Sequence, residues 1–388
     1  MDELTNPFRP GAGTSPPALL GRDDLIDHFG TTVRRAMAGR PGKSLMPIGL
    51  RGVGKTVLLN RFAQIAEYEG LAVGFIEAPE SGDFRSLLTN RLRKILLGYD
   101  NKKKTAKVLK ALRVLKTFSL QLPDGSKVSL DVDALAGSAD SGNLSDDVTD
   151  LLVAAGEAAA ERDSGILLAV DEVQYLTDAE LAALITAIHR TTQQDLPVVL
   201  VGAGLPQLPG LAGDAKSYAE RLFEFPFIGS LQPDDARAAI QVPASEHGVD
   251  FTDDAVDAIV DLAHGYPYFL QEWGYHVWNA AQESPVERDL IDRVSPDVVR
   301  HLDDNFFLVR FDRLTPAEKK YLRAMAELGP GPHRSGDIAA QLGVRVESVA
   351  PRRSGLISKG MVYSPAHGDT AFTVPLFDEF LLREIPDP

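Results

Sequence analysis

Apolar residues in the first 230 positions alternate between short continuous runs and longer segments with helical spacing. The short runs lie at 45–48, 71–76, 165–170 and 197–201, and each predicts a strand buried on both faces. Between them, apolar residues recur at every third or fourth position, which predicts helices. The expected helices span about 22–37, 57–65, 84–97 and 146–161, and another begins at 177–180. This order predicts an α/β fold with a parallel sheet covered on both faces.

Residues 100–145 interrupt that rhythm. A lysine-rich helical stretch at 102–116 precedes two alternating segments, 118–122 and 127–132, on either side of Pro123-Asp124-Gly125. The two segments predict a β-hairpin inserted into the domain. The lysines either follow nucleic-acid phosphates or form the solvated face of an amphipathic helix, and the second arrangement is the commoner one.

From Ser230 the pattern becomes helical and predicts a lid packed beside the first domain. The lid helices are expected at about 233–242, 252–264 and 268–281. A last domain begins at 315–318, where a capping threonine, a proline and a glutamate form a strong helix start. Two short helices and a hairpin follow, at 335–342, 346–359 and 361–374. Three helices closed by a hairpin predict a winged helix, so the expected domains are 1–228, 229–313 and 314–388.

Composition narrows the chemistry. The 388 residues include no cysteine, which excludes disulfides, thiolate nucleophiles and cysteine-type zinc sites, and the eight histidines show no paired ligand spacing along the chain. A net charge of −15 argues against a protein that coats nucleic acid indiscriminately. The start of the chain has no signal-peptide pattern and the apolar runs are too short to span a bilayer, so a cytoplasmic location is the default expectation.

The strongest motif follows the first predicted strand. Residues 49–56, Gly-Leu-Arg-Gly-Val-Gly-Lys-Thr, match the phosphate-binding loop G-x-x-x-x-G-K-[ST] between a strand and a helix. Its glycines let the backbone approach phosphate oxygens, and the helix start presents free N–H groups. Lys55 is expected to reach the phosphates and Thr56 to bind Mg²⁺. The predicted nucleotide contacts are Gly49, Arg51, Gly52, Val53, Gly54, Lys55, Thr56 and Val57.

A second motif supplies the acids that such a site needs. The strand at 165–170 ends in Asp171 and Glu172, as a Walker B segment does. Asp171 is expected to hold the Mg²⁺ shell, and Glu172 to orient or deprotonate the attacking water. Solvated loop acids are the alternative, and the complete phosphate loop upstream disfavours it.

Together, these motifs, the lid and the C-terminal domain resemble the AAA+ and STAND branch of P-loop ATPases, especially bacterial relatives of the origin-recognition initiators. The resemblance implies that Arg22, in Leu20-Gly21-Arg22-Asp23, lies near the nucleotide, and that Arg221 acts as an arginine finger. In such ATPases a neighbouring subunit of a homo-oligomer often supplies this arginine. It also implies that Pro267, in Gly265-Tyr266-Pro267, lies beside the base. Surface positions for Arg22 and Arg221, and an ordinary helix boundary at Pro267, remain open.

Two departures from that family pattern concern the expected rate of ATP hydrolysis. The segment after the strand at 197–201 has no evident polar sensor for the γ-phosphate, and the lid has no clear sensor arginine at Gly-Tyr-Pro. Both favour a slow ATPase, in which the nucleotide sets a conformation.

The predicted third helix of the last domain holds basic residues, Arg352, Arg353 and Lys359, with Arg345 just before it. They are candidate contacts to duplex DNA, although Pro351 is expected to interrupt the helix and winged helices also bind proteins. The leading hypothesis is an Mg²⁺-dependent ATPase that acts as a nucleotide-controlled switch. The alternatives are an initiator-like or regulatory DNA-binding protein with ATP as effector, and a non-hydrolysing ATP-bound scaffold.

Overall fold

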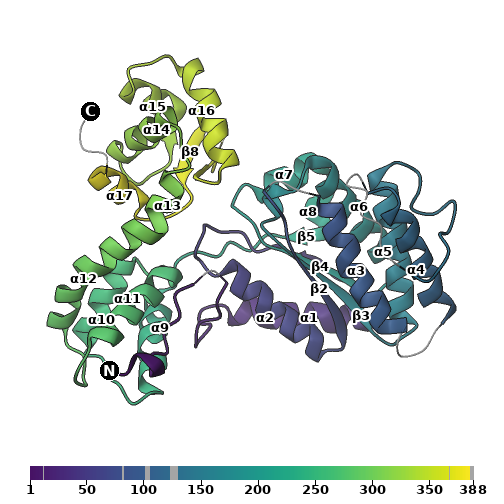
Figure 1. Ribbon diagram of the computed structural model, residues 1–388, viewed down its shortest axis with the longest axis horizontal. Helices are drawn as coiled ribbons and strands as arrows, with labels where there is room; N and C mark the ends of the chain where they lie inside the picture. Colours follow the sequence, from purple (N-terminus) through teal and green to yellow (C-terminus); the bar gives the residue numbers. More distant parts are fainter. Residues whose placement is uncertain (12, 81–82, 101–104, 123–129, 367, 385–388) are drawn as a thin grey trace.

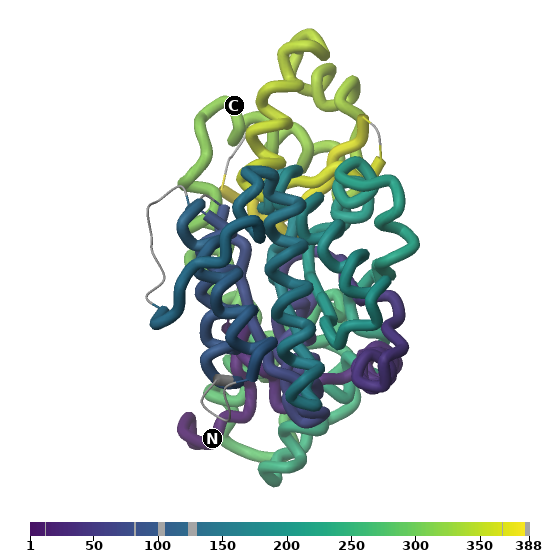
Figure 2. The backbone as a smooth tube through the Cα atoms, turned by 90° about the vertical axis from the view of Figure 1, so that its right-hand side faces the viewer, coloured from purple at the N-terminus to yellow at the C-terminus, as the bar shows by residue number. Residues whose placement is uncertain are grey.

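The computed structural model describes residues 1–11, 13–80, 83–100, 105–122, 130–366 and 368–384. Figure 1 shows a sheet with helices on both faces at one end of the molecule, and a helical domain with the C-terminal domain at the other. The N-terminus lies against the helical domain, so the chain crosses between the two parts before α1 (Asp23–Met37) begins. In Figure 2 the C-terminal domain and the N-terminal segment lie at opposite ends of the molecule.

The sheet is parallel, as predicted. Its strands are β1 (Ser44–Leu45), β2 (Leu71–Glu77), β3 (Gly165–Asp171), β4 (Val198–Gly202) and β5 (Phe223–Glu224). β3 pairs with β2 and β4, β1 pairs with β5, and Ile48 bridges the two groups, which gives the order β2–β3–β4–β1–β5. All seven residues of β3 are buried, because helices cover both of its faces.

Each face of the sheet has its own core. Leu167 and Ala169 pack with α1 and α2 (Lys55–Tyr68), whereas Ile166, Leu168 and Val170 pack with the helices on the other face. Those helices are α3 (Phe84–Asp100), α4 (Ala106–Ser119), α5 (Leu144–Ala160) and α6 (Asp178–Gln193). Two shorter helices, α7 (Leu208–Ala215) and α8 (Ala219–Leu222), lead to β5. The alternation follows from the two-residue period of a strand.

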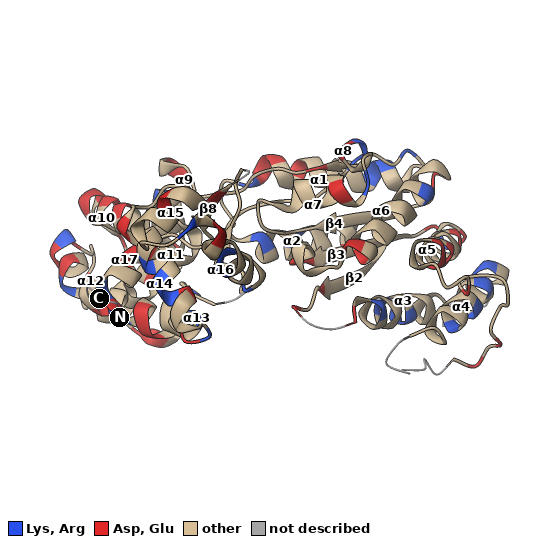
Figure 3. Ribbon diagram, turned by 90° about the horizontal axis from the view of Figure 1, so that it is seen from above, with Lys and Arg blue, Asp and Glu red and all other residues tan. Residues whose placement is uncertain are grey.

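The predicted hairpin at 118–132 is wrong at its first strand. α4 continues to Ser119, because Val114, Leu115 and Phe118 keep a helical spacing and are all buried. Residues 130–132 are not in a strand, and 123–129 lie outside the described residues. Figure 3 shows basic residues gathered on α3 and α4. Lys110 pairs with Glu157 at 3.0 Å, so this part of the lysine run forms a solvated helical face.

The helical domain consists of α9 (Pro233–Ser245), α10 (Asp253–Ala263), α11 (Pro267–Ala280) and α12 (Arg288–Leu302). A π-helical turn, Asp303–Phe307, and the short α13 (Leu308–Phe311) lead out of it. The N-terminal segment packs on this domain: Phe8 is buried against Gly274, and a 3-10 turn (Glu3–Thr5) precedes it. None of the helices within the described residues is long and apolar enough to cross a membrane.

The C-terminal domain has the predicted helices α14 (Pro316–Glu327), α15 (Ser335–Gln341) and α16 (Val346–Ser358). Its antiparallel sheet has the order β6–β8–β7, where β6 is His333–Arg334, β7 is Val362–Tyr363 and β8 is Asp369–Phe372. β6 and a final helix, α17 (Phe377–Glu384), were not expected. α16 is continuous through Pro351, contrary to the predicted interruption, because buried Val349 and Leu356 hold it on both sides. That this domain is a winged helix stays a prediction.

Candidate nucleotide site

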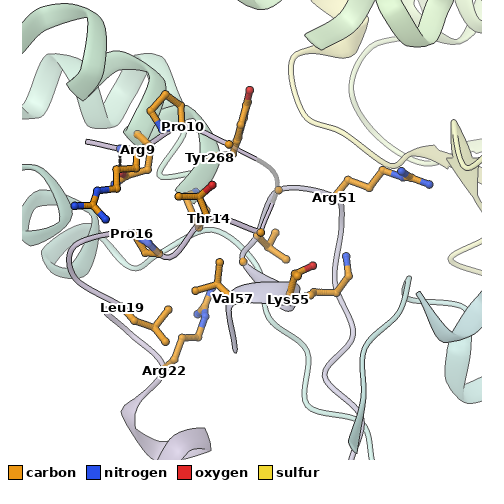
Figure 4. Close-up of a pocket in the computed structure, with 18 of the residues that line it drawn as sticks. Arg9, Pro10, Thr14, Pro16, Leu19, Arg22, Arg51, Lys55, Val57 and Tyr268 are labelled. Carbon is orange, nitrogen blue, oxygen red and sulfur yellow. Dashed lines mark hydrogen bonds between the residues drawn. The ribbon is translucent and has the colours of Figure 1, made fainter. Parts of the chain in front are cut away.

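The candidate site is a cavity of about 480 Å³ between the sheet and the helical domain. Most of its lining comes from the phosphate loop, the acids at the end of β3, the N-terminal segment from Arg9 to Leu20, and α11 with the π-helical turn that follows α12. Residues from the end of β2 and from α9 also line it. Figure 4 shows Lys55 and Val57 near the centre, with Arg22, Thr14 and Tyr268 around them. The site therefore has walls from segments that are distant in sequence.

The phosphate loop has the backbone that its glycines allow. Gly52 and Gly54 have φ angles of +88° and +91°, a region that residues with a Cβ seldom adopt. Gly54 is also the N-cap of α2, so the N–H groups of that helix start lie at the cavity. At Gly49 a Cβ would lie 2.2 Å from the Ile228 carbonyl oxygen. The motif glycines are thus needed by conformation or by space.

Lys55 is 6% exposed, and its ammonium lies within the loop. Nζ donates to the carbonyl oxygens of Gly49 at 2.9 Å and Leu50 at 2.8 Å. Burial lowers the pKa of Lys55, while Glu172 and Asp171 favour its charged form. An ammonium has three N–H donors, so these bonds leave one for an anion.

Thr56 and Asp171 meet at the cavity although they lie 115 positions apart. The Thr56 hydroxyl donates to Oδ2 of Asp171 at 2.5 Å, and the Glu172 N–H donates to Oδ1 at 2.9 Å. Asp171 is 3% exposed, and burial raises the pKa of its carboxyl, an effect opposed by the Thr56 hydrogen bond. The predicted Walker A and Walker B residues are therefore in contact.

The buried Asp171 charge predicts a gain in stability for Asp171→Asn. Because burial raises the carboxyl pKa in the folded state, the penalty of the charged form is present above that pKa and is relieved as the pH falls through it. We expect Asp171→Asn to increase the free energy of unfolding by about 1 kcal/mol at neutral pH, and by less in acid. Thermal unfolding in EDTA between pH 4 and pH 8 checks this.

Asp214→Asn is the matched control, because Asp214 lies exposed in α7. We expect this variant to leave the melting temperature unchanged. A loss of stability in Asp171→Asn at neutral pH would contradict the prediction, since it would mean that the hydrogen bonds of Asp171 outweigh its desolvation.

Glu172 is held by a residue that the motif does not include. Glu172 has a left-handed backbone, with φ 53°, and its Oε2 accepts a hydrogen bond from Nε2 of Gln174. Oε1 of Gln174 accepts the Leu205 N–H at 3.1 Å. Gln174 thus ties Glu172 to the segment after β4, where Gly202, Ala203 and Gly204 carry no polar side chain. The sequence alone does not reveal this role of Gln174. It depends on the pairing of β3 with β4, which brings Gln174 next to Leu205.

The helical domain holds the phosphate loop directly. The Tyr266 hydroxyl donates to the Arg51 carbonyl oxygen, and the Tyr268 N–H donates to the Gly52 carbonyl oxygen at 3.2 Å. Pro267, the first residue of α11, lines the cavity between them. Gly-Tyr-Pro therefore ends one helix and starts the next, and it also contacts the loop.

Arg22 lines the cavity, and that it lies near a nucleotide stays a prediction. Its guanidinium donates to the carbonyl oxygens of Gly229 at 2.7 Å and Gly21 at 3.0 Å, and burial lowers its pKa while Asp235 favours the charged form. The N-terminal segment also reaches the cavity, since the Arg9 N–H donates to Oε1 of Gln271 at 3.0 Å. The sequence pattern does not reveal this wall of the cavity, because proline and glycine give no periodic signal.

Arg310 is a cavity residue that sequence reasoning missed. It lies in α13, its guanidinium lies 4.0 Å from the centre of the Phe306 ring, and Nη1 donates to the Phe306 carbonyl oxygen at 2.7 Å. Burial lowers the pKa of Arg310, and the nearby Arg51 cation lowers it further. The charged form of Arg310 is therefore disfavoured, and an anion bound in the cavity would relieve that cost. The sequence has no clear sensor arginine at Gly-Tyr-Pro. Arg310 does not contradict that, because it lies in α13, after α12.

Arg51 joins the loop to the C-terminal domain. Its N–H donates to the Thr373 carbonyl oxygen at 3.1 Å, and Nη2 donates to the Tyr175 hydroxyl at 2.5 Å. A Cβ at Gly360 would lie 2.4 Å from Nη2, so the guanidinium packs on that glycine. Figure 4 shows the Arg51 side chain extending away from Lys55 toward this domain.

The remaining predicted residues lie elsewhere. Arg221 is exposed in α8 and does not line the cavity. Arg353 donates to the Thr370 hydroxyl, the Ser364 hydroxyl and the Asp369 carbonyl oxygen. Lys359 forms an ion pair with Glu318 at 2.7 Å. Arg345 is exposed and Arg352 half-buried, so two of the four candidate DNA contacts have partners within the domain.

Comparison with known proteins agrees with this geometry. Residues 18–201 match the family model of the AAA ATPase domain. Over this stretch the chain is similar to AAA ATPase domains. The match includes the phosphate loop and both acids after β3, and residues 304–381 match a family described as a domain of unknown function (DUF8462). No curated protein matches the chain.

Solved structures share the P-loop ATPase fold. The Walker-type ATPase PABY2304 of Pyrococcus abyssi is 16% identical with a TM-score of 0.62, over 97% of this chain and 99% of that one. The RuvB Holliday junction branch migration motor of Thermotoga maritima is also 16% identical, with a TM-score of 0.46 over 94% and 96%. The Orc1 protein of Aeropyrum pernix, solved in complex with DNA, is 18% identical with a TM-score of 0.47 over 95% and 94%. The fold is supported by the likeness to the Pyrococcus abyssi ATPase, and at 16% identity that likeness concerns the fold alone.

The side chains that line the cavity suit a nucleotide bound with Mg²⁺. Mg²⁺ prefers oxygen ligands, and the Thr56 hydroxyl and the buried Asp171 carboxylate supply them at one point of the cavity. Lys55, Arg22 and Arg310 line the same cavity with positive charge. The donor set thus suits a phosphate chain with a hard cation.

Proposed function

We propose that this protein binds ATP with Mg²⁺ in the cavity and hydrolyses it slowly, and that the nucleotide controls the contact between the phosphate loop and the C-terminal domain. The observation that carries the proposal is the 2.5 Å contact of Thr56 with Asp171 beside the buried Lys55. Phosphate release from ATP, with Mg²⁺ and with EDTA, tests it. The proposal is overturned if the protein shows no ATP binding and no phosphate release under any of these conditions.

Each polar group of the cavity has a role in this proposal. Lys55 and the N–H groups at the start of α2 bind phosphate oxygens, and Thr56 and Asp171 hold Mg²⁺, which neutralises phosphate charge when bound. Glu172 accepts the proton of the attacking water, in the orientation that Gln174 fixes. The glycines and alanine after β4 supply no further polar contact, which supports slow turnover.

The switch rests on Arg51. Its N–H belongs to the loop that binds phosphate in this proposal, yet it donates to Thr373 in the C-terminal domain. A bound nucleotide and the C-terminal domain therefore both act on the backbone of the phosphate loop at Arg51, either in competition or together. Because a ligand shifts a conformation only through different contacts in the two states, this shared loop supports nucleotide control of the domain.

DNA binding remains an untested prediction for the C-terminal domain. Its four candidate cations include Arg353 and Lys359, whose charged groups bond within the domain. No contact among the described residues favours DNA over a protein partner, so we make no proposal for the partner.

Arg310 predicts a specific loss of ATP affinity. Since Arg310 lines the cavity and is largely removed from water, we expect its guanidinium to bind a phosphate group of ATP. Arg310→Ala should weaken ATP binding about tenfold, the effect of losing one charge-assisted hydrogen bond. Titration with ATP in the presence of Mg²⁺, by calorimetry, measures this.

Arg313→Ala is the control, because Arg313 lies exposed three positions away. We expect Arg313→Ala to bind ATP as the wild type does, and Arg310→Lys to recover part of the lost affinity. Equal ATP affinity in Arg310→Ala and wild type would remove Arg310 from the site while leaving the rest of the proposal intact.

A further inference from the structure

The helical domain contains a group of metal-ligating side chains away from the phosphate loop. Glu272 and His276 lie one helical turn apart on α11, and His301 lies on the adjacent α12. One ligand atom from each lies within 4.8 Å of the others. Nε2 of His276 is 3.6 Å from Oε2 of Glu272, and Nε2 of His301 is 3.9 Å from the same oxygen. Two helices thus direct two imidazoles at one carboxylate oxygen.

The polar atoms at the centre of this group lack hydrogen bonds. Within the described part of the chain, Oε2 of Glu272 and Nε2 of His276 are both buried with no hydrogen-bond partner. Glu272 is only 3% exposed. A buried carboxylate oxygen without a donor is costly. The 3.6 and 3.9 Å separations are longer than a hydrogen bond, so the histidines in these positions do not remove that cost.

The separations suit an ion at the centre. Zinc binds imidazole nitrogen and carboxylate oxygen at about 2.0–2.2 Å, which puts neighbouring ligands of a tetrahedral site about 3.3 Å apart. The group therefore needs to contract by about 0.3 Å and 0.6 Å along these two separations, and the two imidazoles, whose ligand atoms lie within 4.8 Å of each other, must also approach. Two imidazoles with one carboxylate favour a transition metal over Mg²⁺, which prefers oxygen ligands alone. His301 is exposed, so an ion can enter from solvent.

The surrounding side chains orient the ligands. The Tyr268 hydroxyl donates to Oε1 of Glu272 at 2.6 Å, which leaves Oε2 directed at the histidines. Nδ2 of Asn305 donates to the His301 carbonyl oxygen at 3.1 Å and lies 3.2 Å from Nδ1 of the same histidine, so Asn305 holds the position of this ring. Neighbours of this kind set the tautomer and direction of metal-binding groups.

We propose that Glu272, His276 and His301 bind a divalent transition metal of the Zn²⁺ class and so join α11 to α12. The site is separate from Mg²⁺ binding at Thr56 and Asp171, and it does not depend on the proposed ATPase function. The chain has no cysteine, and the described residues offer no second group of this kind.

The test is titration of the full-length, metal-free protein with Zn²⁺ alone, in the absence of nucleotide. We expect one Zn²⁺ per chain by calorimetry, and a higher melting temperature with Zn²⁺ than with EDTA. His276→Ala and His301→Ala should each weaken Zn²⁺ binding about tenfold or more. Binding should also weaken in acid, because a metal ion competes with protons for imidazole nitrogen.

His28→Ala is the matched control. His28 lies 3.3 Å from Glu224 as a single histidine–carboxylate pair on the surface, so its loss should leave Zn²⁺ binding unchanged. His301 is exposed, so His301→Ala should fold, which circular dichroism checks. A loss of Zn²⁺ binding in this variant then reports the loss of a ligand and not unfolding. The proposal is overturned if wild type binds no Zn²⁺, or if His301→Ala binds it with wild-type affinity. In that case the group is a polar contact between α11 and α12 and not a metal site.

Discussion

Lys55→Ala should reduce ATP affinity by at least about 100-fold, the largest effect that we expect from any single substitution here. The lysine is buried within the phosphate loop, so its charge acts on bound phosphate with little screening by water. Its removal takes away a charge-assisted hydrogen bond and leaves phosphate charge unmatched in a buried site. Calorimetric titration with ATP and Mg²⁺ measures the loss, and phosphate release should fall below detection.

Lys43→Ala is the control for Lys55→Ala, because it removes one lysine charge at an exposed position whose ammonium contacts only the Glu220 carbonyl oxygen among the described contacts. We expect it to bind ATP normally. Burial lowers the pKa of Lys55, so the charged lysine is itself a cost to the fold, and Lys55→Ala should remain folded by circular dichroism. Unchanged ATP affinity in this folded variant would refute the proposed site.

Glu172→Gln should separate ATP binding from hydrolysis. Glutamine keeps the shape of glutamate, and its carbonyl oxygen can still accept the hydrogen bond from Gln174, but it cannot take a proton from water. We expect phosphate release to fall about 10²- to 10³-fold, the usual loss for a general base. ATP affinity should stay within about twofold of wild type, because Lys55, Thr56 and Asp171 are unchanged. Single-turnover phosphate release and calorimetry measure the two quantities.

The control for Glu172→Gln is Glu161→Gln, at an exposed position after α5, which should hydrolyse ATP as the wild type does. Equal turnover of Glu172→Gln and wild type would show that Glu172 is not the base. If wild type itself binds ATP and releases no phosphate, the chain is the non-hydrolysing scaffold considered from the sequence.

The parallel sheet and its helices could be predicted because their signals are local. Continuous apolar runs mark the strands from β2 to β4, and the expected strand bounds differ from the structure by about one residue at each end. The hairpin at 118–132 failed for a physical reason: Phe118 to Leu122 fits a strand pattern by itself. In the structure Phe118 and Leu115 are buried against α5, so helical packing decides that segment.

The candidate site likewise has residues that local sequence signals predicted and residues that they did not. Lys55, Thr56, Asp171 and Glu172 could be named because phosphate and Mg²⁺ chemistry fixes residue types at short, readable spacings. Arg310, Gln174 and the N-terminal segment could not, since each reaches the cavity by a path through the tertiary structure. The same holds for His301, which lies 25 positions after His276 and meets it only because α11 and α12 pack together.

The sequence by itself determined that this protein has a P-loop ATPase fold, because a strand, a glycine-rich loop and a helix start must follow one another along the chain to bind phosphate. It also determined the acids that belong to the same chemistry. The tertiary structure decided which cations face the cavity, what holds Glu172, and that Arg51 of the loop contacts Thr373 in the C-terminal domain. These contacts join residues up to about 320 positions apart, and such pairs form only when whole domains pack, which no local pattern encodes.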